Sequence, residues 1–472
     1  MLSNSVILGT LLVATALIYE FYCPLEGRRN DVEDVAASWD REITPPARKR
    51  SRIAIGVNSN LDLIVSALDL LSAMEVGPSS PEDHSSLTSL SDLEQLVGYS
   101  MEHCAGLERV FVDQGLFLKI VEKASSIKHA YHIGGNGALM AQKIQQLVSD
   151  VKVMLVGPVG PTLKGLLHKD ILTPSLSSSS VDEVHMILEY PKGGTWGKVT
   201  ASCANRVIFS HDLSNSRLVA LEQFQDNLTD FNPDLIVLSG AHLLDGQSMD
   251  FQTSRLADIA KLLDSIPRSI PVHWELATVG DLDYFNKLAD TLFSRIDSLG
   301  LNEQELRSAA LAAHANFSKI PSKPPVGYVS DLLLWLMDEY SNRPSSRLTR
   351  VHFHSLTFHM VTTLDNGPWT NAKQSVIAGA TIAGLQACDT DKIDSEKFEL
   401  RLKSYQLSAN DEQLSETLKY NPRTSAVVQW RRGSVNFHMS PVLVCKKPLK
   451  TVGLGDAISS VGLLYSNFAD KV

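Results

Sequence analysis

Short apolar runs alternate with longer amphipathic segments from residue 52 onward. Several of the runs are apolar throughout, as is typical of strands that are covered on both faces. The segments between them carry apolar residues three and four positions apart, which predicts amphipathic helices. This alternation predicts a doubly wound α/β sheet. The expected strands are 53–57, 129–133, 151–156, 235–238, 271–276 and 351–353, and the expected helices are 138–148, 254–263, 329–340 and 371–384.

The N-terminal segment has a different pattern. Its first nineteen residues carry no charged side chain, and residues 5–19 are mostly apolar. This block is shorter than the about 20 residues that span a membrane, and it suits a secretory signal. We therefore expect residues 1–22 to be a signal peptide or a membrane-engaging signal anchor, with the protein in the endoplasmic reticulum or secreted. A buried N-terminal helix is the alternative. Residues 23–51 are polar and predict a linker.

Composition narrows the class of protein. Hydrophobic residues make up 44% of the 472 residues and charged residues 20%, a globular mixture that excludes a disordered or multispanning chain. The net charge of −10 gives no basic footprint of the kind that binds nucleic acid. The five cysteines are too few and too scattered to predict a disulfide framework or a cysteine-based zinc site.

The motif Gly453-Leu454-Gly455-Asp456 precedes an apolar helical pattern near the C-terminus. Glycines let the backbone turn tightly and approach a ligand, and the free amides at a helix start bind phosphate. A carboxylate beside a bound phosphate can accept the proton of an attacking hydroxyl. Asp456 is therefore a candidate general base. The alternative is that it only caps the helix.

Two further loops suit a sugar or a phosphate. One expected strand ends at Gly134-Gly135-Asn136 before a helix, and bare glycine amides can approach either ligand. The first strand is followed by Asn58, Asn60 and Asp62, which offer a hydroxyl-rich ligand both donors and acceptors. A tight turn and a helix cap explain these loops equally well.

Two glutamates are candidates to face a phosphate site. In His273-Trp274-Glu275 the histidine and the glutamate point to the same face of an expected strand. Glu305 falls on the first turn of an expected helix, three residues after Asn302. Magnesium prefers oxygen ligands and keeps several waters, so two such carboxylates can hold it directly or through water. For Glu305 the alternative is a capping box, because Asn-x-x-Glu is a capping pattern.

Together these motifs closely resemble the ADP-dependent glucokinases of eukaryotes, within the ribokinase-like superfamily. The resemblance runs from about residue 53 to 465 and also includes the segments 156–161, 204–212, 238–240, 298–306 and 351–354. It implies a three-layer α/β/α body with a smaller β-rich lid, together spanning 52–472. It also implies transfer of the β-phosphate of ADP to the 6-hydroxyl of glucose, giving AMP and glucose 6-phosphate, with magnesium and in a monomer.

The resemblance implies roles for individual residues as well. Asp456 matches the general base, and Glu275, Glu305 and Asp456 match positions that place magnesium. Phosphate and nucleotide contacts are implied for Arg206, His354, Gly453 and Gly455, and sugar contacts for Asp62, Gly134, Gly135, Asn136 and His185.

One position departs from the family pattern. The family carries Gly-x-x-x-Glu on the helix after the first serine-rich loop, with the glutamate on sugar hydroxyls. Here Gly115 is followed by Lys119, and Glu122 replaces the glutamate only if the helix shifts. Lysine donates hydrogen bonds and does not accept them. The alternatives are therefore a nucleotide-binding relative without catalysis and a kinase of a different sugar. An ATP-dependent sugar kinase on the same fold is a further alternative.

Overall fold

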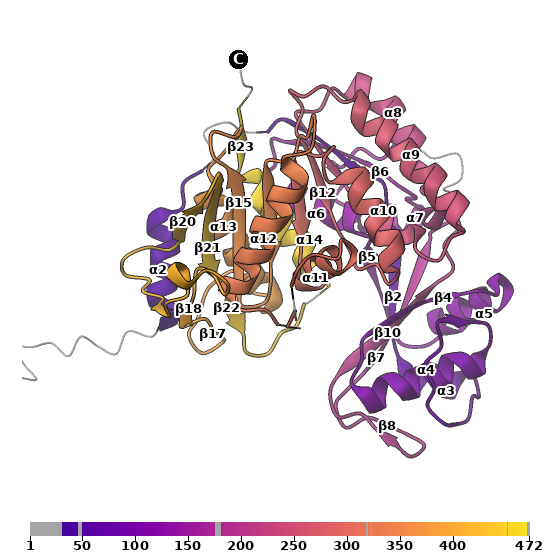
Figure 1. Cartoon of the computed structure of the whole chain (residues 1–472). Helices are drawn as coiled ribbons and strands as arrows, with labels where there is room; N and C mark the ends of the chain where they lie inside the picture. The colour runs from indigo at the N-terminus through magenta and orange to yellow at the C-terminus, as the bar shows by residue number, and fades with distance from the viewer. Residues whose placement is uncertain are drawn as a thin grey trace, which may run out of the picture.

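The computed structural model describes residues 31–45, 50–174, 181–317, 320–321, 323–450 and 452–469. Its larger part, the body, is built on a nine-stranded sheet in the order β20-β21-β15-β14-β13-β12-β11-β1-β6 (Figure 1). Six neighbouring strands are parallel: β6 (Lys152–Val156), β1 (Arg52–Gly56), β11 (Leu235–Leu238), β12 (Val272–Glu275), β13 (Ser298–Leu301) and β14 (Arg350–His354). The remaining three are antiparallel to their neighbours: β15 (Phe358–Leu364), β21 (Val435–Pro441) and β20 (Val428–Arg432).

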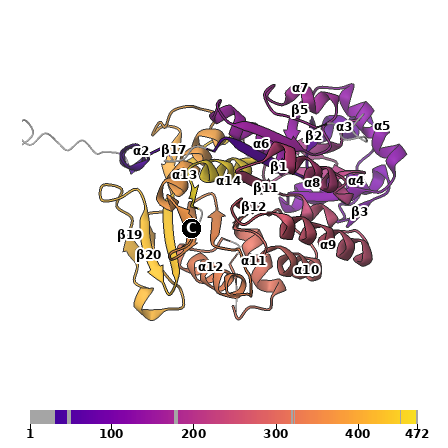
Figure 2. The ribbon, with the colours of Figure 1, turned by 90° about the horizontal axis from the view of Figure 1, so that it is seen from above.

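Helices cover both faces of this sheet (Figure 2). Ile53 and Ile55 pack in one hydrophobic cluster, whereas Ala54 between them packs in the cluster on the opposite face. Strands buried on both faces need apolar residues at every position, which explains their unbroken apolar runs. One face is covered by α6 (Asn136–Leu147), α13 (Ala372–Ala387) and α14 (Leu454–Leu464), and the other by α8 (Ala220–Phe231), α9 (Met249–Ser265), α10 (Leu282–Leu292), α11 (Glu303–Ala312) and α12 (Val326–Ser341).

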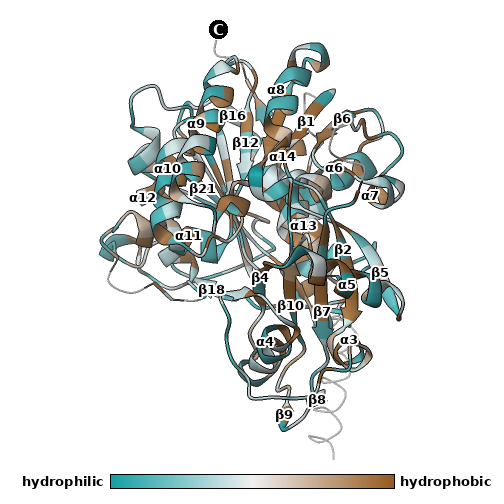
Figure 3. Ribbon diagram, turned by 90° about the vertical axis from the view of Figure 1, so that its right-hand side faces the viewer, coloured by the Kyte–Doolittle hydropathy of each residue, from teal (hydrophilic) through white to brown (hydrophobic). Residues whose placement is uncertain are grey.

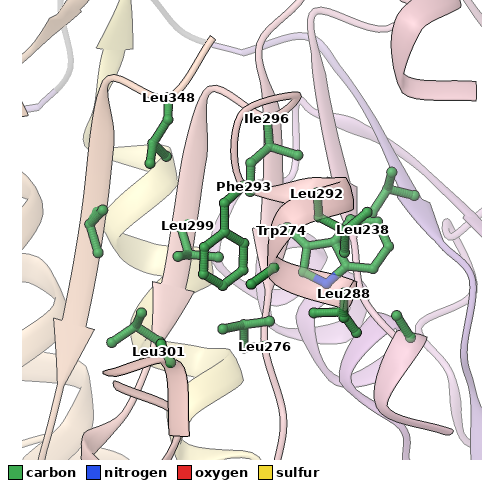
Figure 4. Close-up of a cluster of buried hydrophobic side chains, with 14 of the residues drawn as sticks. Leu238, Trp274, Leu276, Leu288, Leu292, Phe293, Ile296, Leu299, Leu301 and Leu348 are labelled. Carbon is green, nitrogen blue, oxygen red and sulfur yellow. The ribbon is translucent and has the colours of Figure 1, made fainter. Parts of the chain in front are cut away.

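The packing under α10 shows why these helices form where they do. Trp274 of β12 is buried beside Leu288 and Leu292 of α10, and Phe293 lies between this helix and β13 (Figure 4). On the outer side of these helices the residues are polar. Helix α8, for example, is hydrophobic (brown) along one side and hydrophilic (teal) along the other (Figure 3). An apolar stripe against the sheet and a polar outer face are typical of amphipathic helices.

A second, six-stranded sheet forms the lid, residues 60–134 and 184–210, at the lower right of Figure 1. Its order is β3 (Ser86–Leu87), β4 (Leu107–Phe111), β10 (Asn205–Ser210), β7 (Val184–Tyr190), β2 (Asn60–Ser66) and β5 (His129–Gly134). Its outer face is covered by α3 (Ala67–Ala73), α4 (Leu90–His103) and α5 (Gln114–Ser125). The three-layer body and the smaller β-rich lid confirm the expected fold.

The expected strand 129–133 is present, but it is β5 of the lid and pairs antiparallel with β2 instead of joining the body sheet. Its residues alternate between partly buried and exposed, unlike those of the body strands. The remaining short elements are α7 (Pro161–Leu166), β8 (Thr195–Trp196), β9 (Val199–Thr200), β16 (Trp369–Thr370), β17 (Phe398–Leu400), β18 (Ser404–Tyr405), β19 (Leu418–Lys419), β22 (Leu443–Cys445), β23 (Asn467–Phe468), and the 3₁₀ turns Asn215–Arg217, Ala241–Leu244 and Glu412–Leu414.

The prediction of a polar linker over 23–51 is wrong for part of that range. Residues Asp31–Glu42 form the helix α2, which buries Val32, Val35 and Trp39. These side chains share a hydrophobic cluster with residues of α13 and α14. Six of the twelve residues of the helix are charged, so its average composition concealed an apolar stripe.

The N-terminal prediction for residues 1–22 lies outside the described part of the chain. Within the described ranges, none of the helices combines the length and apolar character needed to cross a bilayer.

The cysteine prediction needs correction. Cys104 pairs with Cys203 in the lid, and Cys388 pairs with Cys445 in the body. The partners are 99 and 57 residues apart in sequence. The fold brings them together, so the spacing of the cysteines along the sequence does not predict these pairs.

Candidate active site

The N-terminus of α14 lies at the carboxyl ends of the parallel body strands, where open α/β sheets bind ligands. Gly453 occupies the N-cap position with φ +66°, a left-handed conformation that favours glycine. A Cβ on Gly455 would lie 2.8 Å from Cε1 of His354, so only glycine fits there. Asp456 is the third residue of the helix and not its cap, which removes the capping interpretation.

Asp456 is held inside the site. Its side chain is only 6% exposed, and Nδ2 of Asn136 donates a hydrogen bond of 2.8 Å to its Oδ1. Burial, together with the negative charge of Glu275, raises the pKa of Asp456 to about 7. Burial disfavours the charged form of a carboxyl group, and a nearby like charge adds to this effect. The carboxylate is therefore a base that is available near neutral pH.

Glu275 lies beside this helix start, at the end of β12. Its Oε2 is 3.1 Å from Nε2 of His273 and its Oε1 is 3.0 Å from Nε2 of His354, and all three side chains are buried. Burial alone would raise the pKa of Glu275, but the two histidines lower it to about 2. On the neighbouring strand, a Cβ at Gly300 would overlap Oε2 of Glu275. The glutamate is therefore ionised and fixed in position.

Glu305 forms the capping box that the sequence allows. One carboxylate oxygen accepts from the backbone N–H of Asn302 at 2.7 Å, and the other from its Nδ2 at 2.9 Å. Burial raises the pKa of Glu305 to about 7, to which the charge of Glu275 also contributes. Within the described ranges, no cluster of three or more histidine, cysteine or acidic side chains has the arrangement of a metal centre.

The lid turns a second set of polar residues toward the body. Asp62 on β2 pairs in register with His185 on β7 and with His132 on β5, so the three side chains lie on one face. Burial raises the pKa of Asp62 to about 6. Nε2 of His185 lies 2.9 Å from Oδ1 of Asp212. Burial lowers the pKa of this histidine, but the negative charges around it, Asp212 first among them, together raise it to about 9.

Two glycines connect the lid to the body. The predicted Gly134-Gly135-Asn136 loop begins where β5 ends, and a Cβ at Gly134 would overlap the side chains of Asn60 and Asp62. Gly135 has φ +79° and caps α6, which starts at Asn136. The loop thus places Asn136 against Asp456 while its glycines pass close to Asp62.

A cavity of about 1150 Å³ lies between lid and body. Asp62 and Arg206 line it from the lid, and Lys143, Lys450 and Gly453 line it from the body. Arg206 is on β10 opposite Glu189 of β7, on the face that carries His185. Of the predicted sugar and phosphate residues, Asp62, Arg206 and Gly453 line this cavity, whereas the other predicted residues, Asp456 among them, do not line it.

Glu108 is a candidate that the sequence analysis missed. It is exposed on β4, opposite Ile208 of β10, and alternation along the strands places it on the face that carries Asp62 and His185. Burial has the largest influence on both residues, raising the pKa of Asp62 and lowering that of His185. The negative charge of Glu108 raises the pKa of each. The sequence offers only a weak signal for it, because the adjacent Glu108 and Arg109 interrupt the apolar residues of the short strand.

The interpretation of Lys119 as a departure at the sugar site is wrong. Lys119 is exposed on α5, whose buried residues Phe117 and Ile120 pack against Leu63 and Val65 of β2. These β2 residues alternate with Asp62, so α5 covers the opposite face of the lid sheet. Lys119 and Glu122 therefore lie on the outer layer of the lid.

Comparison with known proteins agrees with this geometry. The family described as "ADP-specific Phosphofructokinase/Glucokinase conserved region" matches residues 51–465. The chain is 43% identical over 439 residues to a Bos taurus protein named "ADP-dependent glucokinase", covering 92% of this chain and 88% of that one. It is 35% identical over 447 residues to the "Probable ADP-dependent glucokinase" of Caenorhabditis elegans, covering 91% and 88%.

Solved structures give the same fold at low sequence identity. A hypothetical ADP-dependent phosphofructokinase from Pyrococcus horikoshii superimposes with a TM-score of 0.65 at 16% identity, over 89% of this chain and 98% of that one. An ADP-dependent kinase in complex with fructose-6-phosphate and ADPβS superimposes with a TM-score of 0.64 at 17% identity, over 92% and 96%. The sequence match over nearly the whole chain establishes what the fold alone leaves open: this chain belongs to the ADP-specific phosphofructokinase/glucokinase family, among the eukaryotic ADP-dependent glucokinases.

Proposed function

We propose that this protein transfers the β-phosphate of ADP to the 6-hydroxyl of glucose, releasing AMP and glucose 6-phosphate. The observation that carries the proposal is the buried Asp456 at the start of α14, beside Gly453 and Gly455 and bonded to Asn136, which follows the last strand of the lid. The names of the bovine and nematode relatives support the choice of donor and acceptor.

Asp456 serves as the base in this reaction. The 6-oxygen attacks the β-phosphorus, the bond from that phosphorus to the bridging oxygen breaks, and AMP leaves with the bond's electron pair. The hydroxyl proton passes to the Asp456 carboxylate, whose pKa of about 7 suits a base at neutral pH. The amides at Gly453 and Gly455 and the N-terminus of α14 stabilise the negative charge of the phosphoryl group. Arg206 offers a planar donor fork to the phosphates from the lid.

Magnesium fits this site through water. Both carboxylate oxygens of Glu275 already face histidines, and both of Glu305 face Asn302. Each oxygen keeps a second lone pair, which can accept a hydrogen bond from a water on the metal. We propose that Glu275, Glu305 and Asp456 would hold the ion through such waters. When bound, magnesium neutralises charge on the phosphates.

The acidic character of the lid favours glucose over a phosphorylated sugar. Asp62, Glu108, Glu189 and Asp212 lie on or beside the cavity-facing side of the lid, against the cations His185 and Arg206. A sugar phosphate would bring further negative charge to this surface, whereas sugar hydroxyls can donate to its carboxylates.

The test of the proposed function is a comparison of substrates, using a chain that begins at residue 31. We expect glucose 6-phosphate to form with ADP, glucose and magnesium, and no comparable product with ATP or with fructose 6-phosphate as acceptor. Product with ATP alone would indicate an ATP-dependent kinase. Binding of ADP without any turnover would indicate the non-catalytic relative.

Glu108 and Lys119 provide a prediction about the sugar site. Replacing Glu108 by glutamine should raise KM for glucose about 10-fold or more, since a hydrogen bond to a charged group contributes about 1.5–3 kcal/mol. Glu122→Gln removes the same charge on the outer face of the lid and should leave KM unchanged, as should Lys119→Glu. Initial rates over a glucose titration measure all three. A tighter KM in Lys119→Glu with no change in Glu108→Gln would place the sugar contact on α5.

We also propose that the protein works in the secretory pathway. The disulfides Cys104–Cys203 and Cys388–Cys445 support this proposal, because such bonds persist in oxidising compartments. The apolar segment 5–19 would provide entry. A monomeric state stays a prediction.

A further inference from the structure

A row of polar residues crosses three neighbouring strands of the body sheet beneath the site. His273 of β12 is in register with Ser298 of β13, and Ser298 is in register with Arg350 of β14. All three side chains are fully buried. Partners in register on parallel strands point to the same face, which here is covered by α13. Parallel strands of this kind are normally apolar throughout, so a polar row needs an explanation.

Arg350 begins the row with a positive charge. Its Nη1 donates to Oγ of Ser298 at 2.7 Å, and its Nη2 donates to Oγ of Ser375 on α13 at 3.0 Å. Its guanidinium lies over the ring of Trp369, 5.4 Å from the centroid. Across the described part of the chain, Arg350 forms no ion pair with a carboxylate. A buried charge is normally paired, so this arginine is placed for something other than a local salt bridge.

Hydrogen bonds lead from Arg350 to Glu275. Nδ1 of His273 lies 2.9 Å from Oγ of Ser298, and Nε2 of the same ring lies 3.1 Å from Oε2 of Glu275. Arginine can only donate, so it occupies a lone pair of the Ser298 hydroxyl and leaves the hydroxyl proton free. That proton is then directed to Nδ1 of His273. An imidazole that accepts at Nδ1 carries its own proton at Nε2, aimed at Glu275.

The opposite tautomer would be unfavourable. If Nδ1 of His273 carried the proton, the lone pair of Nε2 would face the carboxylate of Glu275 at 3.1 Å. The Nε2–H tautomer of His273 is therefore favoured at both ring nitrogens, by the Ser298 hydroxyl that Arg350 orients at Nδ1 and by the Glu275 carboxylate at Nε2.

We propose that Arg350 and Ser298 are positioning residues that act through His273 to hold the Glu275 carboxylate in one orientation at the active site. Neither residue touches a substrate. The catalytic consequence rests on the proposed function, because there Glu275 places the waters around the phosphates. The tautomer of His273 does not depend on that function and can be measured on its own.

Ser298→Ala and Ser375→Ala form a matched pair for the test. Each variant removes one hydroxyl that accepts from the Arg350 guanidinium, but only Ser298 continues to His273. In Ser298→Ala we expect kcat to fall about 10- to 100-fold and the magnesium concentration for half activity to rise, as for other residues that orient ligands around a metal. The KM for glucose should stay near that of the wild type. Ser375→Ala should keep kcat within about 3-fold, because it leaves that orientation intact.

The second measurement is the ¹⁵N spectrum of the protein with labelled histidine, assigned by comparison with His273→Gln. We expect His273 to be the Nε2–H tautomer in all three proteins, with the ¹⁵N signal of Nδ1 shifted in Ser298→Ala alone, because only that variant removes the hydroxyl that donates to Nδ1. Equal kinetic effects of the two serine variants would mean that the polar row has only a structural role, and would overturn the proposal. An Nδ1–H tautomer of His273 in the wild type would also overturn it, and this measurement does not require Ser298→Ala to fold. A wild type without kinase activity but with the Nε2–H tautomer would contradict the proposed function alone.

Discussion

Replacing Asp456 by asparagine should lower turnover about 10³-fold while ADP still binds, because the variant loses the group that accepts the hydroxyl proton. Asparagine has the shape of aspartate and keeps an oxygen for the hydrogen bond from Asn136. The anion-binding amides at the start of α14 do not change. Single-turnover rates of glucose 6-phosphate formation measure the loss, and calorimetric titration with ADP measures binding.

The same variant should be more stable than the wild type at high pH. In the folded protein the pKa of Asp456 is raised from its ordinary value of 3.8 to about 7. The folded state therefore binds this proton more tightly than the unfolded state, and stability from this group falls as pH rises from about 4 toward 7. Above pH 7 the wild type must keep an ionised buried carboxylate, and Asp456→Asn need not. Thermal unfolding at pH 8 and at pH 5 should show a stabilisation that is larger at pH 8.

The activity of the wild type should increase with pH, whereas the stability contributed by Asp456 decreases with pH. A base must be unprotonated to act, so kcat/KM should rise with pH and level off above the pKa of about 7. Near-normal turnover of Asp456→Asn would show that another group takes the proton. A variant that is inactive and also less stable at pH 8 would instead indicate damage to the fold.

The sequence predicted the body well because the physical signals there are local. Strands covered on both faces read as unbroken apolar runs, and glycines mark the strand end at Gly134 and the helix start at Gly453. Asp456, Glu275 and Asn136 could be selected because each follows such a strand end or helix start. The structure then brings them together through contacts that no spacing encodes, such as the bond from Asn136 to Asp456.

The lid was harder to predict because its strands are half exposed. In β4 two adjacent charged residues, Glu108 and Arg109, interrupt the apolar pattern, so the sequence did not predict this strand or its glutamate. The sequence instead pointed to Lys119, but α5 packs on Leu63 and Val65 of β2 and therefore lies on the outer face of the lid. The polar row from Arg350 to His273 could not be predicted from the sequence either, because it depends on the register of three strands.

Helix α2 provides the largest prediction for stability. Trp39 is 2% exposed, and its Nε1 donates to Oγ of Ser440 at 3.1 Å. Its hydrophobic cluster includes Leu454 and Ile458 of α14, the helix that carries Asp456. We expect Trp39→Ala to lower the free energy of unfolding by about 3–5 kcal/mol, as for other buried tryptophans.

The control for this prediction is Asp40→Ala, which changes an exposed residue of the same helix and should stay within about 0.5 kcal/mol of the wild type. Denaturant unfolding of the chain from residue 31 measures both variants. A chain that begins at residue 51 loses the whole helix, including the ion pair of 2.7 Å between Glu42 and Lys373 of α13, and should be less stable than Trp39→Ala. Because α13 and α14 share this cluster, we expect the shorter chain to lose activity at temperatures where the longer chain is still active. Equal stability of the two chains would mean that α2 is the linker its composition indicates, and that the catalytic layer folds without it.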